Sequence, residues 1–98
     1  MFSLCFTPQA DQDLRELERL SSKKQVLKAV RKTLGYMEST LRHPSLFTHE
    51  FRSLKGPLGE KVFEAYVQQN SPGAYRVFWY YGPGKNTLTI IAIVPHST

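Results

Sequence analysis

The sequence predicts a single α+β domain over residues 1–98, in which two helices pack on one face of a twisted, mainly antiparallel sheet. Three observations predict this class. A short alternating strand opens the chain, two stretches of helical periodicity follow it, and apolar or alternating stretches separated by turn residues occupy the second half. The predicted order is therefore strand, helix, helix, and then three or four strands joined as antiparallel hairpins.

Composition narrows the class of protein. The 98 residues are 41% hydrophobic and 21% charged, which is enough apolar material for a core and argues against general disorder. The single cysteine, Cys5, excludes an intramolecular disulfide and fits a reducing compartment. No apolar run approaches a membrane span and no signal peptide is recognisable, so we expect a cytoplasmic protein with no membrane partner. The net charge of +5 modestly favours an acidic or nucleic-acid partner.

The first strand and first helix are predicted from residues 2–20. In "FSLCFT", Phe2, Leu4 and Phe6 alternate with small or polar residues, and Cys5 is expected to be buried. Thr7 followed by Pro8 indicates a helix N-cap and first helical position, and a helix of about three turns should follow.

The second helix is predicted from a regular apolar stripe. Ser22 and Gln25 have capping-box spacing, and apolar residues then recur at helical intervals from Val26 to Leu41, ending before Pro44. The opposite face carries several lysines and arginines in its first half. It is interpreted as a solvated face or, alternatively, as a surface for a polyanion.

The remaining strands are predicted at residues 61–68, 74–81 and 87–95, after an extended segment that contains Gly56, Pro57 and Gly59. Strict alternation would place Val77 and Trp79 on one face of their strand and Arg76 on the other, and would place Ile93 opposite Leu88 and Ile90. Both of the last two strands are apolar on both faces, so they should be central in the sheet.

Arg76 and His96 are predicted to meet at one edge of the sheet. Arg76 lies near the start of its strand and His96 just past the end of the last strand, and these ends are neighbours in an antiparallel hairpin. The end of the preceding strand, Glu64 to Val67, should lie beside them. A guanidinium, an imidazole and a carboxylate could bind and process a phosphodiester. The alternative is that Arg76 is a paired or surface residue and His96 is simply exposed.

The order of these segments resembles the RelE/ParE superfamily of toxins from type II toxin–antitoxin systems. The resemblance covers almost the whole chain. It is carried by "TPQADQDLREL", the long helix to "LRHP", "LKGPLGEKVFEAYV", "GAYRVFWYY" and "TIIAIVPH".

The resemblance implies a ribosome-dependent mRNA endonuclease that uses no metal and no cofactor, with a cognate antitoxin, the ribosome and mRNA as partners. Arg76 would stabilise the phosphate and the transition state, and His96 would act as general acid or base. Glu50 or Glu64 would be the base, Glu50 being the nearest match to a glutamate of some members.

Several further side chains are expected to bind RNA: Arg52, Lys55, Lys61 and Tyr80, the last by stacking on a base or, alternatively, by packing in the core. Where some relatives carry basic residues, this chain has Glu64 and Tyr66. Two other functions therefore stay open: a ParE-like inhibitor of DNA gyrase, and a catalytically degenerate member that only binds an antitoxin.

Overall fold

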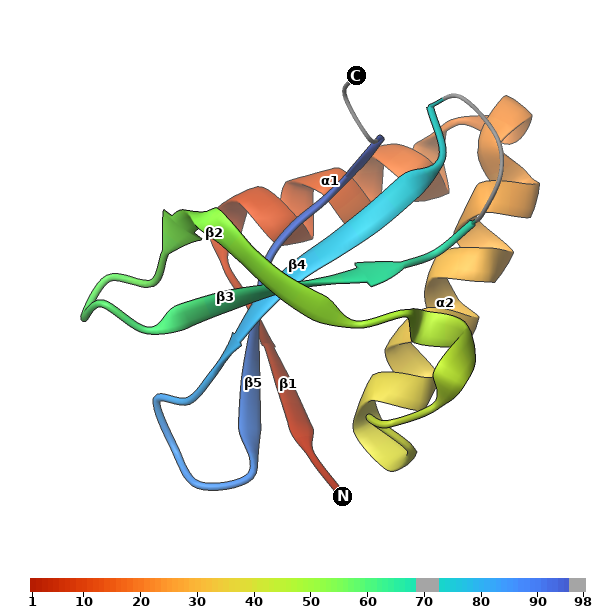
Figure 1. Cartoon of the computed structure of the whole chain (residues 1–98). Coiled ribbons are helices and arrows are strands. Elements are labelled where there is room, and N and C mark those ends of the chain that lie inside the picture. The colour runs from red at the N-terminus through yellow and green to blue at the C-terminus, as the bar shows by residue number, and fades with distance from the viewer. Residues whose placement is uncertain (69–72, 96–98) are drawn as a thin grey trace.

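The computed structural model describes residues 1–68 and 73–95, and its elements follow the predicted order (Figure 1). A sheet of five strands in the order β1-β5-β4-β3-β2 is antiparallel except where β1 pairs with β5. The last two strands are central in it, as predicted. In the described part of the chain no helix is both long and apolar enough to cross a membrane. The elements are β1 (Ser3–Phe6), α1 (Pro8–Arg19), α2 (Lys24–Ser39), β2 (His49–Lys55), β3 (Lys61–Tyr66), β4 (Tyr75–Tyr81) and β5 (Thr87–Pro95), with short 3-10 helices η1 (Ser21–Lys23) and η2 (Pro44–Leu46).

Both helices cover the same face of the sheet, which confirms the predicted arrangement. Val77 and Trp79 point toward them from β4, and the alternation leaves Arg76 on the other face. In Figure 1, α1 lies behind the sheet, whereas β2, at its edge, crosses in front of β3 and β4. The buried core between helices and sheet consists of Ala10, Leu17, Val30, Leu34, Met37, Leu46, Ala65, Val77, Trp79, Leu88, Ile90 and Ile93.

The predicted strict alternation along the last strand is wrong, because β5 contains a bulge. Phe78 pairs with Ala92 but Trp79 pairs with Ile90, so Ile91 is an extra residue in β5. Beyond it, the alternation of side chains between the two faces of the sheet is shifted by one residue. Leu88, Ile90 and Ile93 consequently all reach the core.

Two side chains of the α1 segment satisfy backbone groups of β5 beyond Ile90, where pairing with β1 has ended. The Thr7 hydroxyl donates to the carbonyl of Ile91 at 2.9 Å, and the Asp13 carboxylate accepts from the amide of Ile93 at 2.9 Å. The Thr7 oxygen also accepts from the amide of Ala10, which confirms Thr7 as the N-cap. These bonds fix the first two turns of α1 against the second half of β5.

The predicted capping box at Ser22 is wrong. Ser22 lies in η1, and α2 begins at Lys24 with Lys23 as an N-cap that makes no side-chain hydrogen bond. The link between α1 and α2 is so short that a 3-10 turn occupies the position where an extended cap residue was expected. The apolar stripe of α2 is confirmed, since Val30 and Met37 are fully buried.

The two edge strands, β1 and β2, are more exposed than the centre of the sheet. Cys5 on β1 is exposed, so the expectation of a buried thiol is wrong: only Leu4 and Phe6 on that strand face the core. On β2, residues 52–55 are all exposed, and they include the charged side chains Arg52 and Lys55.

Candidate functional site

The register between β3 and β4 places a group of polar side chains on the sheet face opposite the helices. Tyr66 pairs with Arg76, and Glu64 pairs with Phe78 two residues further along. Side chains at these positions point to the same side, because alternate residues of a strand share a face. The prediction that the end of β3 lies beside Arg76 is thus confirmed.

Arg76 points inward rather than toward solvent. Its residue is only 8% exposed, and Nη1 donates to the carbonyl oxygens of Gln68, Ala74 and Tyr75 at 3.1–3.2 Å. The guanidinium carbon lies 3.9 Å from the centre of the Tyr66 ring, a cation–π contact. Arg76 is therefore fixed by main-chain acceptors and by one aromatic face.

Glu64 lies between Arg76 and a histidine of β2. One carboxylate oxygen is 3.9 Å from Arg76 Nε, and the other is 2.7 Å from His49 Nε2. Glu64 is buried, whereas the His49 side chain is 46% exposed. The three residues form a continuous line from the interior to the surface, with the titratable ring at its outer end.

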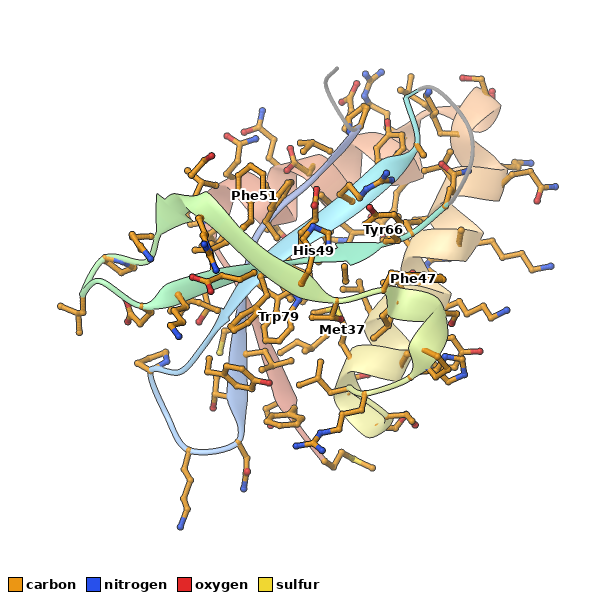
Figure 2. The ribbon with its side chains drawn as sticks, in the orientation of Figure 1. Met37, Phe47, His49, Phe51, Tyr66 and Trp79 are labelled. Carbon is orange, nitrogen blue, oxygen red and sulfur yellow. The ribbon has the colours of Figure 1, made fainter. Side chains whose placement is uncertain are left out.

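His49 is held at both ring nitrogens. Its Nδ1 lies 3.0 Å from the carbonyl oxygen of Phe47, while Nε2 faces Glu64. A carbonyl and an ionised carboxylate only accept hydrogen bonds, so both contacts form together when the ring carries two protons. The ring also meets the edge of Tyr66 at 5.7 Å, and Figure 2 shows His49, Tyr66 and Phe47 close together near the start of β2.

Glu50, the other predicted base, is directed away from this group. It pairs with Phe63, whose side chain packs against the core, while the neighbouring His49 pairs with Glu64. Its carboxylate lies 3.8 Å from Lys55 Nζ and 3.9 Å from Arg52 Nε. Glu50 thus accompanies two of the predicted RNA-binding cations and not Arg76.

The remaining predicted residues are distributed over the sheet. Lys61 pairs with Lys55 at the far end of β3, and five residue steps along the strand, roughly 17 Å, separate it from Tyr66. Tyr80 is 8% exposed, so in this conformation its ring is not available for stacking on a base. His96 lies outside the described residues, directly after Pro95, which pairs with Tyr75.

Two hollows adjoin the segment that leads from α2 into β2. One, of about 370 Å³, is lined by Phe47, Thr48 and the core-facing aromatic side chains of β3 and β4. The other, of about 340 Å³, lies between α2 and the end of β3 and is lined in part by Tyr66 and Gln68. Within residues 1–68 and 73–95, no three His, Cys, Asp or Glu side chains are grouped so as to hold a metal ion.

Comparison with solved structures identifies the architecture. The YoeB/ParE toxin from Agrobacterium tumefaciens superposes with a TM-score of 0.69 at 13% identity, over 99% of this chain and 100% of that one. The archaeal RelE–RelB complex from Pyrococcus horikoshii superposes with a TM-score of 0.64 at 14% identity, over 96% of this chain and 93% of that one. The E. coli RelBE toxin–antitoxin complex superposes with a TM-score of 0.61 at 16% identity, over 100% of both chains. No protein-family model matches the sequence, and no curated protein matches it either.

The chain has the RelE/ParE toxin fold. The match extends over essentially the full length of the chain, so the RelE/ParE-like architecture includes both helices and every strand of the sheet. At these identities the likeness establishes the fold, and the chemistry has to be argued from the side chains of this chain.

Within this RelE/ParE-like fold, the role of His49 in the polar group was missed by sequence reasoning. The signal was the alternation of His49 and Phe51, which predicts a common face and is matched by the contact of Phe51 with Phe78 at 4.9 Å. Placing His49 beside Glu64 from that signal would also have required the register of β2 against β3. The register depends on η2 and on a shift between Glu50 and Lys55, which periodicity does not reveal.

Proposed function

We propose that this protein is the toxin of a type II toxin–antitoxin module and that it cleaves mRNA on the ribosome without a metal ion. The observation that carries the proposal is the line of Arg76, Glu64 and His49, which presents an accessible imidazole fixed by a buried carboxylate. The RelE/ParE toxin fold supports the toxin role.

Cleavage of RNA by its own 2′-hydroxyl needs a base and an acid. The 2′-oxygen attacks the adjacent phosphorus while the base removes its proton, the bond to the 5′-oxygen breaks, and the acid protonates that leaving oxygen. The products are a 2′,3′-cyclic phosphate and a 5′-hydroxyl end. A histidine can take either part near neutral pH. We assign one part to His49, whose Nδ1 has to leave the Phe47 carbonyl to exchange a proton with RNA while Nε2 stays on the buried Glu64 carboxylate. We keep His96 as the predicted second group.

In this proposal Arg76 acts through Glu64. Its guanidinium is already bonded to three carbonyl oxygens and is buried, so direct contact with a phosphate would require it to leave those acceptors. Where it lies, its guanidinium faces one oxygen of the Glu64 carboxylate, and the other oxygen of that carboxylate orients His49. This differs from the direct contact with phosphate that the sequence suggested.

The proposed partners are a cognate antitoxin, the ribosome and mRNA. Two of the structures with this fold are complexes, one of them named as a toxin–antitoxin complex, and a chain with a net charge of +5 suits an acidic partner. We expect the antitoxin to be a short acidic protein whose helix or extended segment covers the basic surface.

Expression of the chain in a bacterial host tests the proposal. We expect slower growth, restored by the antitoxin, and primer extension should show cuts within translated mRNA. His49→Gln should lower cleavage by roughly 10²-fold or more, because the acid–base group is lost. His43→Gln is the matched control, since that ring lies outside the line of Arg76, Glu64 and His49, and a glutamine oxygen can still accept from the Ser45 amide that His43 Nδ1 caps in η2. Intact mRNA with normal growth would refute the proposal.

The burial of Arg76 favours a second candidate, a family member that binds an antitoxin without cutting RNA. In that case the chain would bind its antitoxin tightly, yet expression alone would leave growth and mRNA unchanged. Slow growth with double-strand DNA breaks and intact mRNA would instead identify inhibition of DNA gyrase.

A further inference from the structure

Phe47 has an unusual backbone conformation for an aromatic residue. It ends η2 in the left-handed region, at φ 46° and ψ 42°, and in the described part of the chain only one other non-glycine residue, Asn86, has a positive φ. A bulky side chain is rarely found there because its Cβ crowds the backbone. Such conformations persist where the surroundings enforce them, and they are concentrated at functional sites.

Core packing does not explain the Phe47 ring. The preceding residue, Leu46, is 1% exposed and fills the core position of this turn, whereas Phe47 is 56% exposed. The ring lies 5.9 Å from Tyr66 and lines the larger of the two hollows. A large apolar ring is thus presented to solvent at the rim of a cavity.

The backbone of the same residue holds the proposed acid–base group. The Phe47 carbonyl oxygen lies 3.0 Å from His49 Nδ1, so the left-handed turn that exposes the ring also aims this carbonyl at the imidazole. The Tyr66 ring contacts Phe47, His49 and the Arg76 guanidinium. Figure 2 shows Phe47 beside His49 at the entry to β2.

We propose that Phe47 stacks on a nucleobase next to the scissile phosphate and so positions the RNA for His49. This inference rests on the proposed function and adds to it a subsite for a single-stranded base. Stacking on an exposed aromatic ring is a common way to hold single-stranded RNA, and Arg42, which lines the same hollow as Phe47, adds a positive charge there. The chain carries 13 lysines and arginines against 8 acidic residues.

Two variants of Phe47 and one control distinguish the role of the ring from that of the backbone. Phe47→Ala removes the stacking surface but keeps the carbonyl that bonds to His49, and Phe47→Trp restores an aromatic face. Leu58→Ala is the control, because Leu58 is also an exposed apolar side chain but lies in the β2–β3 turn. Cleavage is measured by primer extension on purified ribosomes programmed with a defined mRNA, over a range of toxin concentrations. Binding to a 2′-O-methyl copy of the same RNA, which cannot be cut, is measured in parallel.

We expect Phe47→Ala to weaken binding of the uncleavable RNA by about 5- to 100-fold and to require correspondingly more toxin for half-maximal cleavage. Phe47→Trp should retain wild-type binding, as should Leu58→Ala. A thermal melt of each variant establishes that it is folded.

The outcomes distinguish this inference from the function on which it rests. If the wild type cleaves and His49→Gln does not, but Phe47→Ala binds and cleaves as the wild type does, the stacking role is overturned and the proposed function stands. If Phe47→Ala keeps RNA binding but loses affinity for the antitoxin, Phe47 is a protein anchor and the inference is again wrong. If the wild type neither binds nor cleaves RNA, both proposals fail.

Discussion

Replacing Glu64 with glutamine tests the buried charge pair most directly. The substitution keeps the size of the side chain and removes its negative charge, which leaves Arg76 buried without that partner. At the 3.9 Å between Glu64 Oε2 and Arg76 Nε, the lost attraction is about 4 kcal/mol at an effective dielectric constant of about 20. The three carbonyl acceptors of Arg76 remain, so we expect the free energy of unfolding to fall by about 2–4 kcal/mol.

The assay is urea denaturation of the purified protein, with the slope of the transition held in common between variants. The same substitution is made in an Arg76→Met background, where no buried positive charge is left. We expect Glu64→Gln to cost at least about 1.5 kcal/mol less in that background, as for contacting residues in a double-mutant cycle. An equal cost in both backgrounds, or a cost below about 1 kcal/mol in the wild type, would refute the argument from charge pairing.

Three further predictions concern the fold, each measured by the same denaturation. Thr7→Ala should lower the free energy of unfolding by about 1–2 kcal/mol because it removes the N-cap and the bond to the β5 bulge. Thr7→Ser keeps the hydroxyl and should retain most of that stability. Asp13→Ala should cost about 1–3 kcal/mol because the Ile93 amide loses its acceptor, and a neutral effect would contradict that role. Ser22→Ala should change stability by less than about 0.5 kcal/mol, and a loss typical of a helix cap would show that the cap is formed.

The order of elements was predictable because it depends on periodicity and on turn residues. The Thr7–Pro8 start of α1, the stripe through Val30 and Met37, and the antiparallel neighbours of Arg76 were each encoded within a short stretch of sequence. The placement of Arg76 on the face away from the helices followed from alternation alone.

The details of the site were not predictable, because they depend on irregular backbone. The left-handed turn at Phe47 sets the entry to β2 and brings His49 to Glu64, and no hydrophobic pattern signals such a turn. The bulge at Ile91 shifts the alternation of side chains along β5 by one residue, and no glycine in that strand indicates it from the sequence. The buried guanidinium of Arg76 is satisfied by three carbonyl oxygens between residues 68 and 75, and their convergence on Nη1 depends on backbone geometry that alternation does not predict.

The exposed edge at β2 has a consequence for how copies of this protein behave when they meet. A free strand edge invites a second strand to continue the sheet, and many proteins discourage this with charge. Here Arg52 and Lys55 lie on that edge, with Lys61 opposite Lys55 on the neighbouring strand. Two β2 edges brought together would place like charges opposite each other. We therefore expect these basic side chains to oppose continuation of the sheet from one molecule into the next.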